Sequence, residues 1–438
     1  MNCQSEKLKG LKIAFHTLGC KVNQYETEVM ENEAALHGAL IVPFAEQADV
    51  YVVNTCTVTN IADRKSRQML HRARTLAPEA VVVACGCYTE TSDQAALYAD
   101  GVDLVLGNER KKDFAEALSA FLSERKLPEN PDINKVQGYR PEFLTKVHEH
   151  TRAELKVQDG CNEFCSYCLI PYARGRIRSK APEAVLQEIR TLSETGIREF
   201  VLTGIHLSSY GRDLSEGGDL LELIRRAAAV EGVERVRLGS LEPRVITPAF
   251  AEGLAAIPEI CPHFHLSLQS GSATVLRRMN RKYTPEEYLE ALRLLRSAFD
   301  LPAVTTDVIV GFPGETEEEF RESLAFVREA SFYELHVFQY SRRKGTVADR
   351  MPGQVPEVLK KARSAEMIAL GEEMSEAYRQ SFLGRCAEVL TEEPDPANPG
   401  FYQGYTREYI RTLVRAKAPG EIISGVLRFQ NERYITEI

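Results

Sequence analysis

The segment Cys161-Asn-Glu-Phe-Cys165-Ser-Tyr-Cys168 brings three cysteines close together, shortly after residues 154–157, where apolar and charged side chains alternate as in a strand. Three thiolates in one loop can occupy three corners of a [4Fe–4S] cluster, because its irons favour thiolate ligands. A structural zinc site needs four closed ligands, and this loop holds no fourth Cys or His. Three unrelated core cysteines are the alternative. The spacing predicts an iron–sulfur site with one iron open to a substrate or cofactor.

Strand and helix signals alternate after this loop in the way that is typical of a parallel α/β barrel. The expected strands lie at 154–157, 199–202, 235–238, 263–268, 304–310 and 334–339. Six such units are fewer than the eight of a closed TIM barrel. We therefore predict a partial (βα)6 barrel over residues 145–372, with its ligands at the carboxyl ends of the strands.

Two smaller units are expected on either side of the barrel. Residues 10–125 alternate short β-branched runs with helical stretches, which predicts a small parallel α/β sheet. Residues 126–144 are rich in Pro, Asn and charge, as linkers are. Residues 373–438 begin within a charged helical stretch and continue as short strands separated by Gly, Pro and Asn, which predicts a small all-β barrel.

The composition sets limits on the class of protein. With 438 residues, 44% hydrophobic and 27% charged, the chain is globular, and its ten cysteines are too sparse for a disulfide scaffold. The N-terminal segment has no apolar signal region and no long apolar stretch follows, so we expect a cytoplasmic protein with no membrane partner. A net charge of −9 argues against a protein that coats nucleic acid broadly, although a local basic face could still bind RNA.

Three further cysteines, Cys20, Cys56 and Cys87, each follow a predicted strand of the first unit. Since successive ends of parallel strands lie along one edge of a sheet, these thiols can converge into a second open cluster site; cysteines merely packed at strand ends are the alternative. Cys85 lies two residues before Cys87 and is expected on the same face of the strand, as a bystander or a spare ligand. His206, near another strand end, is expected to pack in the core or at the barrel rim.

The Cys161 loop, with Tyr167 before its last cysteine and a partial barrel after it, resembles the radical S-adenosylmethionine (SAM) superfamily. The resemblance implies that the open iron chelates SAM, which an electron from the cluster cleaves to a 5′-deoxyadenosyl radical. The residues expected to contact SAM lie in the loop or at strand ends: Tyr167, Thr203, Gly204, Ser240, Glu242, Gln269 and Ser270. Taken alone, each strand-end segment is an ordinary strand-to-helix turn.

Two open cysteine triads with these flanking segments resemble the methylthiotransferases, which have an N-terminal cluster domain, a radical-SAM core and a C-terminal TRAM domain. The segment Thr17-Leu-Gly-Cys20-Lys-Val-Asn-Gln-Tyr25 resembles the subgroup that acts on N6-threonylcarbamoyladenosine in tRNA. The resemblance implies addition of a methylthio group to C2 of that nucleoside at position 37. It also implies two [4Fe–4S] clusters, on Cys20, Cys56 and Cys87 and on Cys161, Cys165 and Cys168, with two SAM per turnover and an electron donor such as flavodoxin or ferredoxin.

Three alternatives remain open at this point. Within the same family, the substrate could be isopentenyladenosine in tRNA or an aspartate of a ribosomal protein. Outside it, the chain could be an iron–sulfur protein that binds RNA without catalysis.

Two basic segments are candidates for RNA contact. Tyr409, Arg411, Arg415 and Lys417 recur at every second or fourth position, which predicts one basic and aromatic strand face suited to phosphate contact and base stacking. A merely solvated strand face is the alternative. Arg174 and Arg176, just beyond the cysteine loop, form a second candidate near the active site.

Overall fold

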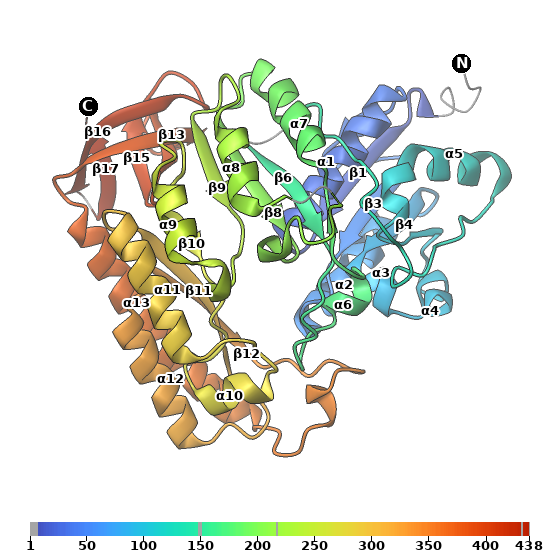
Figure 1. Cartoon of the computed structure of the whole chain (residues 1–438). Coiled ribbons are helices and arrows are strands. Elements are labelled where there is room, and N and C mark those ends of the chain that lie inside the picture. The colour runs from blue at the N-terminus through green and yellow to red at the C-terminus, as the bar shows by residue number, and fades with distance from the viewer. Residues whose placement is uncertain (1–7, 148–150, 216–217, 431, 438) are drawn as a thin grey trace.

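The computed structural model describes residues 8–147, 151–215, 218–430 and 432–437. The chain forms three bodies in sequence order: a parallel sheet with helices near the N-terminus, an open barrel in the middle and a closed β-barrel near the C-terminus (Figure 1). The expected fold class is confirmed. Within the described ranges, no helix is both long enough and apolar enough to cross a membrane.

The N-terminal sheet has the strand order β2-β1-β3-β4-β5, and all of its strands are parallel. These strands are β1 (Lys12–Thr17), β2 (Leu40–Val42), β3 (Val50–Thr55), β4 (Val81–Gly86) and β5 (Leu104–Leu106). The helices are α1 (Lys21–Leu36), α2 (Asn60–Leu76), α3 (Cys87–Thr91), α4 (Gln94–Ala99) and α5 (Phe114–Glu124). Met30 of α1 and Phe114 of α5 pack in an apolar core on one face of the sheet, and Leu70 of α2 and Leu97 of α4 pack in another core on the opposite face. Helices therefore cover both faces, as a parallel sheet requires.

The central body is an open barrel of six parallel strands. They are β6 (Arg152–Asp159), β8 (Glu199–Gly204), β9 (Arg235–Leu238), β10 (His263–His265), β11 (Ala303–Val310) and β12 (Glu334–Gln339). Strands β6, β8 and β9 form one run and β10, β11 and β12 another, and a parallel bridge between Leu241 and Leu266 joins the two runs. The short β7 (Arg178–Ser179) pairs antiparallel with β6. The partial barrel predicted from the alternation is confirmed.

Helices cover the outside of this barrel. They are α7 (Pro182–Glu194), α8 (Leu220–Ala228), α9 (Pro248–Ala255), α10 (Ala273–Arg278), α11 (Pro285–Ala298), α12 (Glu317–Ala330) and α13 (Glu357–Ser381), whereas the short α6 (Ile170–Ala173) after the cysteine loop packs against α3 of the N-terminal body. Thr284 and Thr316 begin α11 and α12 with complete capping boxes, which satisfy backbone N–H groups of the first turn. Ala153, Leu155 and Val157 of β6 join the apolar core under α7. Since successive side chains of a strand point to opposite faces, Arg152, Glu154 and Lys156 face the barrel interior.

The C-terminal body is a closed barrel with the strand order β13-β14-β15-β17-β16. Its strands are β13 (Cys386–Pro394), β14 (Phe401–Thr406), β15 (Arg411–Arg415), β16 (Ile422–Gln430) and β17 (Arg433–Glu437). Arg235 and Arg237 of β9 donate hydrogen bonds to the carbonyls of Glu388 at 2.7 Å and Thr406 at 2.8 Å. The small barrel thus docks near the amino ends of the central strands, away from the cysteine loop.

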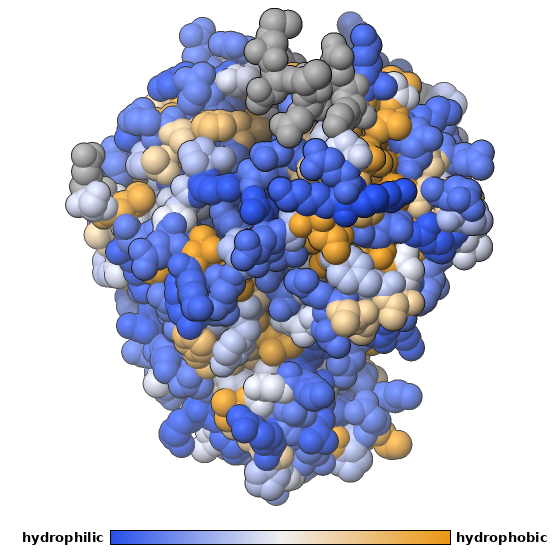
Figure 2. All heavy atoms as spheres, turned by 90° about the vertical axis from the view of Figure 1, so that its right-hand side faces the viewer, coloured by the Kyte–Doolittle hydropathy of each residue, from blue (hydrophilic) through white to orange (hydrophobic). Residues whose placement is uncertain are grey.

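Residues 126–144 follow an irregular path with buried anchor points. Ile133 and Leu144 are buried, and the side-chain oxygen of Asn130 accepts a hydrogen bond from the Gly107 N–H at 2.7 Å. The connection is therefore packed against its neighbours. The face seen from the N-terminal side is mostly hydrophilic with small, separate apolar patches (Figure 2).

Candidate functional site

The Cys161 loop begins where β6 ends and is held by backbone hydrogen bonds, from Cys161 to Gly175 at 3.1 Å and from Ser166 to Met279 at 2.9 Å. Burial raises the pKa of Cys161 and of Cys168 to about 12, and the nearby Cys165 thiol adds to the rise in both. Bare thiolates are therefore unfavourable here, whereas a bound metal deprotonates its thiol ligands. This set of three neighbouring thiols fits a [4Fe–4S] cluster with one open iron.

One arginine links this loop to the interior of the barrel. Arg281 donates from Nη1 to the Sγ of Cys165 at 3.2 Å and from Nη2 to a carboxylate oxygen of Glu242 at 2.8 Å. Burial by itself raises the pKa of Glu242, but hydrogen bonding to His206 and the charge of Arg281 hold it below its usual value. Glu242 is thus a buried carboxylate beside the cysteine loop.

The other residues predicted to contact SAM lie at the same end of the barrel. Thr203 and Gly204 end β8, Ser240 follows β9, and Gln269 and Ser270 follow β10. Thr203, Gln269 and Ser270 are buried, whereas Ser240 is exposed. Tyr167 packs against Phe312, with ring centroids 6.4 Å apart. Their contact with SAM remains a prediction.

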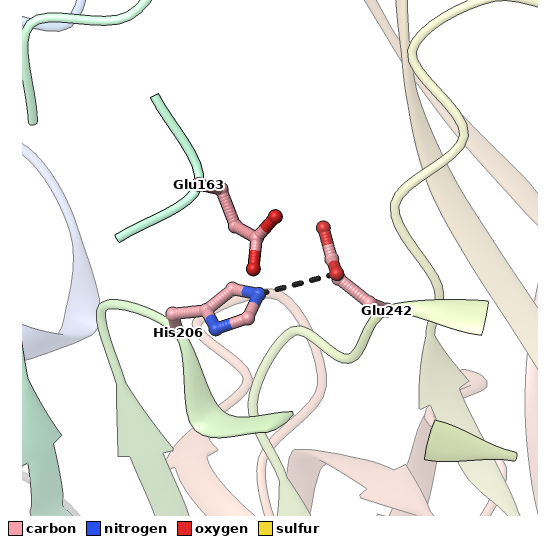
Figure 3. Close-up of side chains that lie close together, drawn as sticks. All are labelled: Glu163, His206 and Glu242. Atoms are coloured by element: carbon pink, nitrogen blue, oxygen red, sulfur yellow. Dashed lines mark ion pairs between the residues drawn. The ribbon is translucent and has the colours of Figure 1, made fainter. Parts of the chain in front are cut away.

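A polar group that the sequence analysis did not anticipate lies beside the loop. Glu163, His206 and Glu242 point toward one another from three different strand ends (Figure 3), and their ligand atoms lie within 4.8 Å of one another. His206 Nε2 is 3.3 Å from a Glu242 oxygen. His206 therefore faces this polar group, where only core or rim packing was expected. The sequence did offer one signal for His206: it lies two residues beyond Gly204, just past the carboxyl end of a barrel strand, where ligands bind.

Cys20, Cys56 and Cys87 follow β1, β3 and β4 at one edge of the N-terminal sheet. Two glycines allow the close approach. A Cβ at Gly19 (φ +107°) would lie 3.1 Å from the Sγ of Cys56, and a Cβ at Gly86 (φ +97°) would lie 2.4 Å from the Thr55 carbonyl oxygen. Burial raises the pKa of Cys56 to about 12, and the Cys87 and Cys20 thiols add to the rise. These thiols also fit an open iron–sulfur cluster.

Cys85 takes no part in this edge. Strand β4 ends at Gly86, where the chain turns into α3, and the Cys85 side chain lies in the apolar core with Val83 and Leu106. The expectation that Cys85 and Cys87 share a face is wrong because the strand stops between them. Its place in the apolar core agrees with the bystander interpretation, which remains a prediction.

The first of the predicted basic RNA contacts is corrected by the structure. Arg174 is fully buried and forms an ion pair with Glu26 of α1 and a hydrogen bond to Asn23 at 2.5 Å. Arg174 cannot contact RNA, because its guanidinium is buried and already bonded to these two side chains. Arg176 is half-buried and lies over the Phe164 ring at 4.6 Å, so its RNA contact remains a prediction.

The second basic segment is only partly the strand face expected. Arg411, Arg415 and Lys417 lie on or just after β15, and all three are exposed. Tyr409 precedes that strand with φ +72° and stacks on Tyr405 at 4.5 Å. The guanidinium of Arg237 lies 4.7 Å from its ring. Tyr409 therefore belongs to the joint between the two barrels, because docking turns it away from the arginines.

A cavity of about 410 Å³ connects that joint with the N-terminal triad. Its lining includes Cys20 and Lys21 from the first body, Arg152 and Glu154 from β6, and Tyr405 and Tyr409 from the small barrel. Cys20 is exposed here. The N-terminal cysteine site is thus accessible from the interior of the central barrel.

The fold and the cysteine loop agree with comparisons to known proteins. Residues 155–327 match the Radical SAM superfamily, whose members hold a [4Fe–4S] cluster and SAM, and residues 12–107 match the uncharacterized protein family UPF0004. A solved structure of the radical SAM methyltransferase TsrM from Kitasatospora setae shares the fold, with a TM-score of 0.57 and 19% identity over 77% of each chain.

Relatives along almost the whole chain are more specific. The chain is 42% identical to the threonylcarbamoyladenosine tRNA methylthiotransferase MtaB of Bacillus subtilis over 407 residues, which cover 92% of this chain and 90% of that protein. It is 34% identical to a tRNA-2-methylthio-N(6)-dimethylallyladenosine synthase of Caldicellulosiruptor saccharolyticus, over 93% of this chain and 88% of that protein. The chain belongs to the radical SAM methylthiotransferase family.

Proposed function

We propose that this protein adds a methylthio group to C2 of N6-threonylcarbamoyladenosine at position 37 of tRNA. The observation that carries the proposal is the pair of cysteine triads, one at the edge of the N-terminal sheet and one in the loop after β6. The higher identity to the threonylcarbamoyladenosine enzyme than to the dimethylallyladenosine enzyme supports this substrate.

Cys161, Cys165 and Cys168 hold one [4Fe–4S] cluster in this proposal, and Cys20, Cys56 and Cys87 hold a second. Such clusters, with two SAM per turnover, would supply the one-electron chemistry that opens an unactivated aromatic C–H bond. They would also supply the methylated sulfur that is added there. The protein's own residues position the reactants and limit access of water. Arg281 and Glu242 orient the first site, and the cavity beside Cys20 leaves the second site accessible. An electron donor such as flavodoxin or ferredoxin completes the cycle.

The arrangement of the bodies suggests how a tRNA is held. The eight residues of β6 separate the small barrel from the cysteine loop by roughly 26 Å. Arg411, Arg415 and Lys417 would therefore contact the phosphate backbone away from the reacting base. Arg176, beside the cysteine loop, would lie closer to nucleotide 37.

Mass spectrometry of tRNA nucleosides tests the proposal, with and without the gene in its own host. Loss of 2-methylthio-N6-threonylcarbamoyladenosine, with accumulation of its unthiolated precursor, is the expected result. Loss of the isopentenyladenosine derivative instead would select the other tRNA substrate. If no tRNA nucleoside changes, the proposed substrate is wrong.

A further inference from the structure

We propose that Arg174 is a positioning residue that couples the two cysteine sites and raises the reduction potential of a cluster bound by Cys20, Cys56 and Cys87. This inference rests on the proposed function, since it requires the N-terminal cluster. Arg174 lies six residues beyond Cys168 in the sequence, but its side chain ends in the other cysteine site.

The first contact is with a thiol. Arg174 donates from Nε to the Sγ of Cys87 at 3.2 Å, and both residues are buried. Asn108 supports the same arrangement, with its amide nitrogen 2.7 Å from the Ala173 carbonyl oxygen and 3.9 Å from the Cys87 Sγ. The end of the radical-SAM cysteine loop is thereby fixed against the third cysteine of the N-terminal triad.

The second contact extends to the other two cysteines. Arg174 donates from Nη2 to Asn23 at 2.5 Å. The amide nitrogen of Asn23 in turn donates to the carbonyls of Leu18 at 2.6 Å and Thr55 at 3.0 Å, which precede Cys20 and Cys56. One guanidinium therefore supports all three loops that carry the N-terminal cysteines.

Buried carboxylates keep Arg174 in place. Glu26 accepts from Nη2 at 3.0 Å and also binds Lys156 at 2.6 Å, while Asp159 lies 3.6 Å from Nη1. A buried charge without partners is very unfavourable, so these carboxylates make the cation stable at this position. The Nε–H remains directed at the thiol.

This geometry has a consequence for redox chemistry. A reduced cluster carries one more negative charge than the oxidised cluster, so a cationic donor to its sulfur stabilises the reduced state more. Hydrogen bonds to sulfur and local charge are known determinants of cluster potential. Loss of Arg174 should make the N-terminal cluster harder to reduce.

The test uses the full chain with Cys161, Cys165 and Cys168 changed to Ala, so that only the N-terminal site can load. EPR-monitored redox titration then gives the midpoint potential of the N-terminal cluster in three proteins: with the native Arg174, with Arg174→Gln and with Arg174→Lys. Arg178→Gln is the matched control, because Arg178 is also buried and lies 3.3 Å from Asp159, yet no described cysteine thiol contacts it.

We expect Arg174→Gln to shift the midpoint to more negative potential, Arg174→Lys to shift it less, and Arg178→Gln to leave it near the parent value. An unchanged midpoint in Arg174→Gln, or an equal shift in Arg178→Gln, would overturn the inference. If Arg174→Gln binds no iron while Arg178→Gln binds normally, the positioning role is supported; if neither binds iron, it is overturned. If the parent with native Arg174 binds no iron, the proposed N-terminal cluster itself is wrong.

Discussion

Arg281 and Cys165 are joined by a hydrogen bond of 3.2 Å from the guanidinium to the thiol, and the same guanidinium binds Glu242. Each cysteine triad thus has one buried arginine on one of its sulfurs, Arg281 in the barrel and Arg174 in the N-terminal site. Neither arginine belongs to the segment of the cysteine that it contacts: Arg281 follows α10, and Arg174 follows α6.

Replacing Arg281 by Met should weaken SAM binding by about tenfold or more, since a hydrogen bond to a charged group contributes about 1.5–3 kcal/mol. The change removes the donor that orients Glu242, a predicted SAM contact. Equilibrium dialysis of SAM with the reconstituted enzyme measures the effect. Arg293→Met on the exposed face of α11 is the control. Equal SAM affinity in the Arg281 variant and the control would contradict a role of Arg281 and Glu242 in SAM binding.

The two triads should be separable in function. Cys165→Ala is expected to lose release of 5′-deoxyadenosine from SAM, whereas Cys56→Ala should keep this activity but form no methylthio product. Each variant should retain about four irons where the parent holds about eight. Cys85→Ala is the control and should retain all the iron, because Cys85 lies in the apolar core. Methylthio product from Cys56→Ala would contradict the division of labour.

The exposed arginines of β15 provide a test of RNA binding. Reversing the charge of Arg411 and Arg415 to Glu should lower tRNA affinity and reduce the salt dependence of binding, by about 0.7–0.9 in the logarithmic slope for each phosphate that the protein no longer neutralises. Filter binding over a series of salt concentrations gives both quantities. Arg293→Glu with Arg328→Glu, on exposed faces of α11 and α12, controls for net charge. The same reduction in both pairs would mean that charge anywhere on the surface suffices.

The positions of the cysteines could be predicted because they depend on local pattern. Short β-branched runs predicted the strand ends, and parallel strand ends meet at one edge, so Cys20, Cys56 and Cys87 could be grouped from the sequence alone. The expectation that Cys85 and Cys87 share a face failed because it assumed that the strand continues past Gly86, where the chain instead turns into α3.

The polar residues depend on contacts between bodies, which one sequence does not reveal. Arg174 was expected on the surface, but Glu26 and Asn23, some 150 positions earlier, bury it. Tyr409 was expected to face RNA, but docking of the small barrel places it against Arg237. Glu163, His206 and Glu242 converge from three separate strand ends, and only the closure of the barrel brings them together.

Glu199 at the base of β8 should control attachment of the small barrel. It accepts a hydrogen bond from Arg237 at 2.7 Å and lies 3.4 Å from Arg235, the two arginines that bind carbonyls of the small barrel. Burial opposes ionisation of Glu199, yet the charges of Arg237, Arg152 and Arg235 lower its pKa from 4.5 to about 2. Because the folded-state pKa is the lower one, this stabilisation is fully present above about pH 4.5 and is lost as the pH falls toward about 2.

Glu199→Gln should therefore destabilise the protein at pH 7 by about 3–5 kcal/mol, because two buried guanidinium groups lose their shared counter-charge. The urea midpoint of the variant should fall, and limited proteolysis should release the small barrel earlier than in the parent. Glu290→Gln, which breaks an exposed ion pair with Arg293, should leave both measurements unchanged. If Glu199→Gln and Glu290→Gln have the same midpoint at pH 7 as the parent, the small barrel is held by its carbonyl hydrogen bonds and apolar contacts without help from this carboxylate.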